Sequence, residues 1–342
     1  MMDLHRRFDS ALRDTVDEWK KRDEVEGIFT YGSVVRGTAT ANSDLDLVIL
    51  WKSEEAPARL MAEHKGVLVD MDFIPVTKLG EIFDEIEDHA FTVAGVISRL
   101  KGARVEFDRE GEVKKWVEKA RAYRWPESTM RKVKQVALDE LTMAEKYLAD
   151  EEIVSAVHEM RGGIFDLSRL IIMRNNVFDI IKPSEVLSNL RMLDPMMYQL
   201  FLRTFRLKGF GEGNLLEILE IVRNWLKKAV DRFESNEKVT ADSPVGAHLT
   251  QAQRNYYGAQ TLTLNGDYEL AILEMRRSIT MIGLAFLTLE NAYSAGDSVM
   301  GKLREHEPTF YQEVILEYGA FDLLPKGVQR GIAEAKFIAE RL

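Results

Sequence analysis

Cysteine is absent from this sequence of 342 residues, so disulfide bonds and thiolate metal sites are excluded. A chain without cysteine fits a reducing compartment, and we expect a cytoplasmic location. The six histidines are scattered with no pair at metal-binding spacing, which argues against a zinc site. No apolar run reaches the roughly 18 residues of a membrane span, and the first residues lack the apolar segment of a signal peptide. We therefore expect no membrane association.

An excess of positive charge is also lacking. The chain has 46 lysines and arginines against 56 aspartates and glutamates, a net charge of −10. Broad, sequence-independent binding to nucleic acid relies on basic surface, so we do not expect it, although a local basic groove is compatible with this composition. The length exceeds that of a typical single core and predicts two or three domains.

Mixed strand and helix patterns occupy the first third of the chain. Apolar residues three or four positions apart predict a helix over residues 3–22, and similar spacing predicts helices at 54–65 and after Thr77. Short apolar runs predict strands, in chain order, at 26–31, 44–50, 67–75 and, as an edge strand, 104–107. Residues 1–118 are therefore expected to form an α+β domain with a small mixed sheet.

The rest of the chain is helical in pattern and repeats itself. The triplet Glu-Met-Arg at 159–161 recurs 115 positions later, at 274–276. The stretch that begins at Pro195 recurs 113 positions later, beginning at Pro308. The change in shift falls between predicted helices, where an insertion or deletion costs little.

This repeat predicts two tandem copies of one all-α helical bundle, at 119–235 and 236–342. The duplicated bundles would also offer a surface for a homo-oligomer. The repeated Glu159 and Arg161 are expected to form a structural ion pair. The pair Gly162-Gly163 inside a predicted helix indicates close helix packing or a kink, because glycine costs about 1 kcal/mol relative to alanine there.

A pair of aspartates follows a Gly-Ser turn near the start of the chain. Asp44 and Asp46 are two positions apart in an apolar run, so in a strand both carboxylates lie on one face. Two carboxylates held together are costly unless a cation neutralises them, and hard oxygen ligands suit Mg²⁺. A third carboxylate is expected from the strand at 67–75, where Asp70 and Asp72 share a face and parity cannot separate them.

The turn itself has the features of a phosphate cradle. Gly32 lets the backbone approach a triphosphate closely, and Ser33 offers a hydroxyl and an amide at the start of a helix. Arg36 lies one turn along and is placed to pair with a phosphate oxygen. Ser43, directly before Asp44, is a candidate nucleotide contact, with a turn role as the alternative.

These motifs resemble those of the polymerase-β type of nucleotidyltransferase, in the branch of the minimal and aminoglycoside nucleotidyltransferases. The pattern is a Gly-Ser turn, about ten residues, and then Asp-x-Asp between apolar residues. The resemblance implies that Asp44, Asp46 and a third acid hold two Mg²⁺ ions. The run Asp70-Met71-Asp72-Phe73-Ile74-Pro75 matches longer members and favours Asp70, whereas the pattern of shorter members would favour Asp72. The helical copies look like the HEPN-type bundles that accompany such enzymes.

The function implied is a Mg²⁺-dependent transfer of NMP from an NTP, with ATP as the expected donor, to an acceptor hydroxyl. The acceptor is open: a small molecule, a protein or an RNA. The alternative is a catalytically silent nucleotide-binding module of regulatory or antitoxin-like type. A HEPN ribonuclease is not expected, because no histidine follows the repeated arginines at five to seven positions. Aminoglycoside-modifying relatives make Glu140 and Glu145 candidates for a general base, although we expect both to be solvated helix residues.

Overall fold

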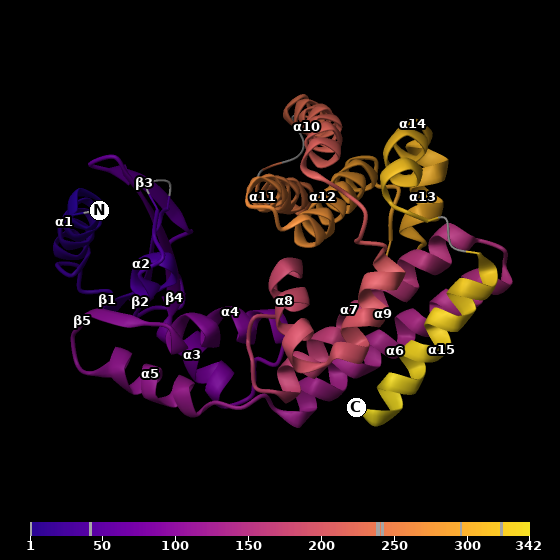
Figure 1. Ribbon diagram of the computed structural model, residues 1–342. Coiled ribbons are helices and arrows are strands. Elements are labelled where there is room, and N and C mark those ends of the chain that lie inside the picture. The colour runs from indigo at the N-terminus through magenta and orange to yellow at the C-terminus, as the bar shows by residue number, and fades with distance from the viewer. Residues whose placement is uncertain (1, 41–42, 237–239, 241–242, 295, 322–323) are drawn as a thin grey trace. The chain divides into compact units, whose positions relative to one another are not determined.

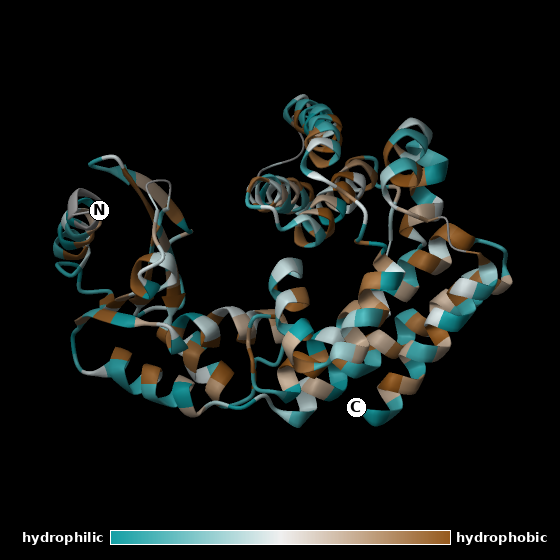
Figure 2. Ribbon diagram, in the orientation of Figure 1, coloured by the Kyte–Doolittle hydropathy of each residue, from teal (hydrophilic) through white to brown (hydrophobic). Residues whose placement is uncertain are grey.

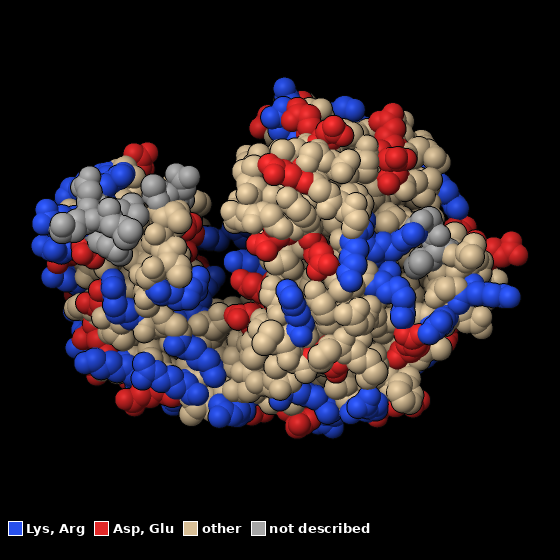
Figure 3. All heavy atoms as spheres, viewed as in Figure 1, with Lys and Arg blue, Asp and Glu red and all other residues tan. Residues whose placement is uncertain are grey.

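The computed structural model describes all residues except 1, 41–42, 237–239, 241–242, 295 and 322–323 (Figure 1). Contacts divide the chain into two compact units, residues 1–130 and 131–342. Among the described residues, every helix is too short or too polar to traverse a bilayer. Lysines and arginines are interspersed with aspartates and glutamates among the described residues on the face drawn in Figure 3. No continuous basic surface covers that face.

The first unit is built on a five-stranded mixed sheet with the strand order β3-β4-β2-β1-β5. The strands are β1 (Val25–Thr30), β2 (Leu45–Trp51), β3 (Leu60–His64), β4 (Val67–Pro75) and β5 (Arg104–Asp108). The central strand β2 runs parallel to β4 and antiparallel to β1, while β5 forms one edge. The sheet with its helices, followed by a helical second unit, confirms the predicted fold class.

Residues 54–65 were predicted as a helix, and this prediction was wrong. Residues 60–64 form β3, which pairs antiparallel with β4. The two strands are joined by Lys65 and Gly66, both with positive φ (52° and 73°). Two central residues of positive φ are typical of a tight hairpin turn. The local helical spacing was therefore overridden by pairing with a strand that is buried in the sheet.

Helices cover the sheet of the first unit on both faces. They are α1 (Met2–Trp19), α2 (Gly32–Arg36), α3 (Val76–Phe83), α4 (Ala90–Lys101) and α5 (Glu112–Ala122). The predicted first helix is confirmed as α1, which packs Phe8, Leu12 and Trp19 into one core with Leu47 and Phe73 of the sheet. Because side chains alternate along a strand, the even-numbered residues of β2 and β4 face away from α1.

The second unit contains helices joined by loops, and no strand among its described residues. Its helices are α6 (Glu127–Ala149), which begins in the first unit, and α7 (Ile153–Arg174), α8 (Pro183–Leu193), α9 (Pro195–Phe205), α10 (Glu212–Glu234), α11 (Pro244–Leu264), α12 (Tyr268–Leu289), α13 (Val299–His306), α14 (Pro308–Phe310), the π-helix η1 (Tyr311–Leu316) and α15 (Pro325–Arg341). Hydrophilic and hydrophobic residues alternate around these helices (Figure 2). Such amphipathic helices are stabilised mainly by burying their apolar faces against one another.

Helix bounds recur with the shifts found in the sequence. Helix α12 begins and ends 115 positions after α7, and α14 and α15 begin 113 positions after α9 and α10. The left-handed residues Asn176 and Asn291 are also 115 positions apart. Helix α10 packs mainly on α11 and α12, whereas α15 packs on α7 and α9. One hydrophobic core therefore spans both sequence copies. The internal duplication of the helical region, and the domain boundaries after residues 118 and 235, remain predictions from the sequence.

The repeated arginines do not form the ion pairs that were predicted. Arg161 is 8% exposed, and its guanidinium donates to the carbonyl oxygens of Thr204 (3.0 Å), Gly319 (2.7 Å) and Ala320 (2.9 Å). Likewise, Arg276 donates to the carbonyl oxygens of Tyr318 (2.9 Å) and Phe205. Each arginine thus bonds carbonyls from both copies. Carbonyls near helix ends have no intrahelical partner, so these bonds satisfy them and tie the copies together.

The glycine pair in α7 lies where α6 approaches closely. A Cβ on Gly163 would lie 2.7 Å from Leu141 Cγ and 2.9 Å from the carbonyl oxygen of Ala137. A Cβ on Gly162 would lie 2.8 Å from Glu140 Oε1. The predicted close packing is therefore what the structure shows at this pair.

Glu140 and Glu145 were both expected to be solvated, and only Glu145 is. Glu145 is exposed and pairs with Lys336 at 2.6 Å. Glu140 is mostly buried, and its Oε2 has no hydrogen-bond partner. Burial raises the pKa of Glu140 to about 8, with the negative charges of Asp166 and Glu159 adding to the effect and Arg169 and Arg277 opposing it.

The variant Glu140→Gln is expected to be more stable than the wild type at alkaline pH. The folded state keeps the Glu140 proton up to about pH 8, whereas the unfolded state releases it near 4.5. Because the unfolded state binds fewer protons in this window, wild-type stability falls as the pH rises through it. Glutamine cannot ionise, so we expect the variant to gain about 4 kcal/mol in free energy of unfolding at pH 8. Denaturant unfolding at pH 4 and pH 8 tests this; an equal difference at both pH values would contradict it.

Candidate nucleotide and metal site

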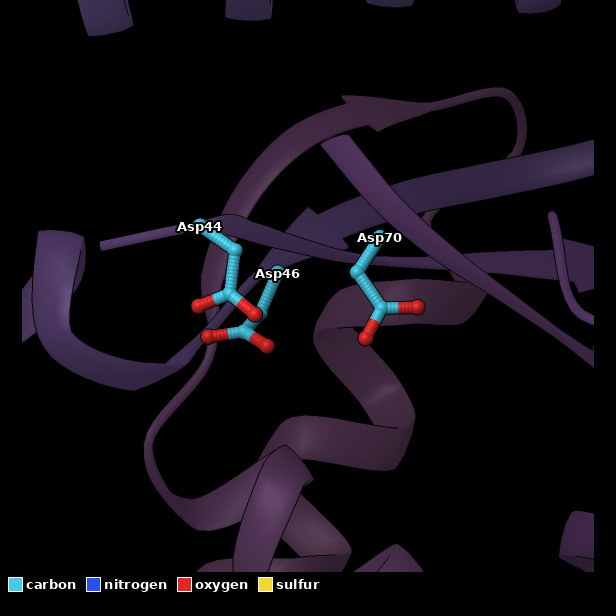
Figure 4. Close-up of side chains that lie close together, drawn as sticks. All are labelled: Asp44, Asp46 and Asp70. Carbon is cyan, nitrogen blue, oxygen red and sulfur yellow. The ribbon is translucent and has the colours of Figure 1, made fainter. Parts of the chain in front are cut away.

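Three aspartates meet at one end of the parallel strand pair. Asp46 on β2 lies opposite Asp70 on β4 in the parallel register, and Asp44 directly precedes β2. One carboxylate oxygen from each lies within 4.8 Å of those of the other two. Figure 4 shows the three carboxyl groups gathered on the same side of the strands. This arrangement matches the one expected from the sequence, in which Asp44 and Asp46 share a face with an acid of an adjacent strand.

The crowding of these acids has an electrostatic cost. Burial raises the pKa of Asp46, the negative charges of Asp44 and Asp70 add to this shift, and the resulting pKa is about 6. Asp70 is only 4% exposed. A hard divalent cation prefers carboxylate oxygens and would neutralise this charge, so the three residues fit such an ion.

Asp70 and Asp72 differ in their surroundings, although they share a face of β4. Asp70 belongs to the acidic group, whereas Asp72 forms an ion pair with Arg99. Arg99 also lies over the ring of Tyr31, 5.4 Å from its centroid. The geometry favours Asp70 as the third ligand, in line with the longer sequence pattern.

Arg59 is a feature that the sequence prediction missed. Its Nε donates to Asp70 Oδ1 at 2.6 Å, and its Nη2 donates to Asp70 Oδ2. The arginine lies just before β3, in the segment predicted as a helix. Only the hairpin of β3 with β4 brings it to Asp70, and no local pattern in the sequence signals that pairing. The guanidinium therefore supplies positive charge where the third carboxylate would meet a cation.

Gly32 is required by the close approach of Asp46 to the turn. It has a φ of +79°, and a Cβ built on it would lie 2.1 Å from Asp46 Oδ2. The N–H of Tyr31 donates to the carbonyl oxygen of Asp46 at 3.3 Å, which holds the turn against β2. Helix α2 begins at Gly32, and the side chain of Tyr31 does not cap it. No side chain among the described residues accepts a hydrogen bond from the first amides of α2, including that of Ser33, so these amides are available to an anion.

The two remaining candidates differ in how free their side chains are. Arg36, in the last turn of α2, forms no hydrogen bond or ion pair with any residue that the structure describes. Ser43 is engaged in a turn, since its Oγ accepts from the N–H of Thr40 at 2.9 Å. Arg36 is thus available to bind a phosphate oxygen. Ser43 instead stabilises a turn, which was the alternative considered for it.

A protein-family model agrees with this geometry. Residues 12–135 match the family model described as nucleotidyltransferase domain. No curated protein sequence matches the chain. A crystal structure of a nucleotidyltransferase-like protein from Exiguobacterium sibiricum 255-15 aligns over 90% of this chain and 91% of that chain, with 13% identity and a TM-score of 0.41. By the family match, residues 12–135 of this chain are similar to a nucleotidyltransferase domain.

Proposed function

We propose that this protein transfers a nucleoside monophosphate from an NTP, with ATP as the expected donor, to an acceptor hydroxyl. The acceptor oxygen forms a bond to the α-phosphorus while the bond from that phosphorus to the bridging oxygen breaks. Pyrophosphate leaves, and the hydroxyl proton passes to solvent. The convergence of Asp44, Asp46 and Asp70 within 4.8 Å carries this proposal.

Each site residue has a role in the proposal. Asp44, Asp46 and Asp70 would hold two Mg²⁺ ions, which acidify the acceptor hydroxyl and neutralise the leaving pyrophosphate. The turn at Gly32 and Ser33 presents backbone amides to the triphosphate, and Arg36 pairs with a phosphate oxygen. Ser43 shapes the approach of the chain to Asp44. The acceptor is a small molecule, a protein or an RNA, to be identified by screening once the donor is known.

One observation favours the alternative of a nucleotide-binding module without turnover. The guanidinium of Arg59 occupies both carboxylate oxygens of Asp70. If Arg59 stayed there in the nucleotide complex, Asp70 would be a poor metal ligand, and binding would not lead to transfer.

Calorimetric titration of ATP, GTP, CTP and UTP with Mg²⁺ tests the proposal, followed by an assay for pyrophosphate release. We expect Mg²⁺-dependent binding of a preferred nucleotide and release of pyrophosphate when an acceptor is supplied. Binding without release across a broad acceptor screen would favour the silent module. No binding of any nucleotide by folded protein would overturn both.

The variant Arg59→Gln is expected to respond more strongly to divalent cations than the wild type. Without Arg59 the buried Asp70 loses its partner, which we expect to cost about 1–2 kcal/mol because Arg59 is itself partly exposed. A bound cation restores the missing charge, so the rise in melting temperature on adding Mn²⁺ should exceed that of the wild type. The control is Arg99→Gln, which removes the partner of Asp72 instead. Equal Mn²⁺ responses in the two variants would contradict the assignment of Asp70.

A further inference from the structure

The second unit holds a cavity, separate from the acidic site, in which charged side chains lie among apolar ones. Its volume is about 210 Å³, and it is lined by residues of α6, α7 and α12 among others. Four lining positions of α7 recur 115 positions later as lining positions of α12, Arg161 and Arg276 being one such pair. The cavity therefore lies where corresponding faces of the two sequence copies meet.

Charged and polar groups line this cavity without partners. Arg276 is 9% exposed, and its Nη2 has no hydrogen-bond partner. Within the described part of the chain, His158, Glu159 and Arg277 form no hydrogen bond or ion pair. Two lining atoms, Arg276 Nη2 and Glu140 Oε2, are buried and have no partner among the described residues. Each such atom costs about 1–3 kcal/mol, so native proteins rarely leave two together. Such a group of side chains indicates a ligand that completes their bonding.

Glu274, the counterpart of Glu159 in the second copy, is satisfied. Glu274 accepts a hydrogen bond from the side chain of Asn255 and another from the N–H of Ser184 at 3.0 Å. In the first copy the counterparts are Glu159 and Glu140, so a carboxyl group stands where the second copy has an amide donor. The first copy therefore lacks the internal bond that satisfies the second.

Gly162 leaves space for the Glu140 carboxyl group, which replaces the amide of Asn255 in the first copy. Glu140 lies over Gly162, where a Cβ would come within 2.8 Å of its carboxylate. The position equivalent to Gly162 is Arg277, which lines the same cavity. Arg277 is exposed, so its guanidinium can reach solvent as well as the cavity.

The balance of charge in the cavity is positive. Arg161, Arg276 and Arg277 contribute three guanidinium groups to the lining. Burial raises the pKa of Glu140 to about 8, so it is largely protonated at neutral pH. Burial also lowers the pKa of His158 to about 4, with the charges of Arg161 and Arg277 adding to the shift, so the ring is neutral. Among the described lining residues Glu159 is then the remaining carboxylate, while Asp166 and Glu274 act on Arg277 from outside the lining.

We propose that this cavity binds a small molecule bearing a phosphate group, held by Arg276 Nη2 and Arg277. Guanidinium groups bind phosphate oxygens through strong, charge-assisted hydrogen bonds. Glu159 and the Glu140 carboxyl group face the same space and hydrogen-bond to hydroxyl groups of the ligand. A cavity of about 210 Å³ suits inorganic phosphate or a short phosphate monoester and is smaller than the common range of small-molecule sites. The proposal does not depend on the nucleotidyltransferase activity.

Calorimetric titration of the full chain without Mg²⁺, using inorganic phosphate and glycerol phosphate as probes, tests this site. The variant Arg277→Met removes the guanidinium while keeping most of the side-chain volume. The matched control is Arg254→Met, an exposed arginine of α11 outside the cavity lining. A second control, Arg36→Met, reports phosphate that binds at the Gly32 turn instead.

We expect the wild type to bind at least one probe and Arg277→Met to bind it at least 10-fold more weakly. Arg254→Met and Arg36→Met should bind it as the wild type does, and circular dichroism should show all variants folded. Tighter binding of glycerol phosphate would identify a phosphorylated metabolite as the ligand class, and tighter binding of phosphate would identify the free ion. Equal affinity of Arg277→Met and wild type, or no binding of either probe by the wild type, would overturn the proposal.

Discussion

Replacing both Asp44 and Asp46 by asparagine is expected to lower Mg²⁺-dependent nucleotide transfer by at least about 1,000-fold. Asparagine has nearly the shape of aspartate but lacks the charge that holds a divalent cation. Mg²⁺-dependent nucleotide binding, measured by calorimetry, should be lost together with pyrophosphate release. The control is Asp84→Asn, an exposed aspartate of the same unit outside the acidic group.

The same double variant should be no less stable than the wild type without metal. The folded-state pKa of Asp46 is raised from 3.8 to about 6, so ionised Asp46 destabilises the folded protein. Wild-type stability is therefore expected to fall as the pH rises from about 4 to about 6, and asparagine removes that loss. A stable variant without transfer would separate chemistry from folding. A stable variant that retains Mg²⁺-dependent transfer would show that these aspartates do not hold the metal.

Gly32→Ala is expected to lower nucleotide transfer by about 100-fold, because a small misplacement of reacting groups has costs of this order. The added Cβ would lie 2.1 Å from Asp46 Oδ2, so the carboxylate or the turn must move. The positive φ of +79° adds backbone strain of about 1 kcal/mol. Steady-state kinetics and denaturant unfolding measure the two effects separately.

Gly37→Ala is the matched control for this prediction. Gly37 has a similar φ of +72° at the other end of α2, but a Cβ there meets nothing within 4 Å. It should lose a comparable amount of stability while keeping its activity within about threefold of the wild type. Equal activity in the two alanine variants would show that the approach of Gly32 to Asp46 is unimportant for the reaction.

The amino-acid sequence alone predicted the features that depend on local geometry. The two-residue period of a strand placed Asp44 and Asp46 on one face, and the Gly-Ser turn predicted a strand-to-helix junction at Gly32. Helical spacing likewise predicted α1 and the helical second unit. The nucleotidyltransferase domain followed from these short-range patterns, and the family match over residues 12–135 confirms it.

Strand pairing between distant segments determined which aspartate of β4 joins the acidic group and which residues form β3, and neither could be predicted from side-chain parity or spacing. The register of β2 with β4 places Asp70 beside Asp46, while Asp72 is paired with Arg99. The hairpin of β3 with β4 overrode a local helical pattern and brought Arg59 to the acids.

Packing between the sequence copies decided the rest. Because of this packing, Arg161 donates hydrogen bonds to carbonyls far along the chain instead of forming the predicted ion pair. The packing also buries Glu140, which the sequence suggested would be solvated. Periodicity reports which face of an element is apolar, so the sequence by itself determined most of the elements, although not β3, and the acidic motif. Which polar groups meet across those faces depends on contacts between segments up to 159 positions apart, and only the tertiary structure decided them.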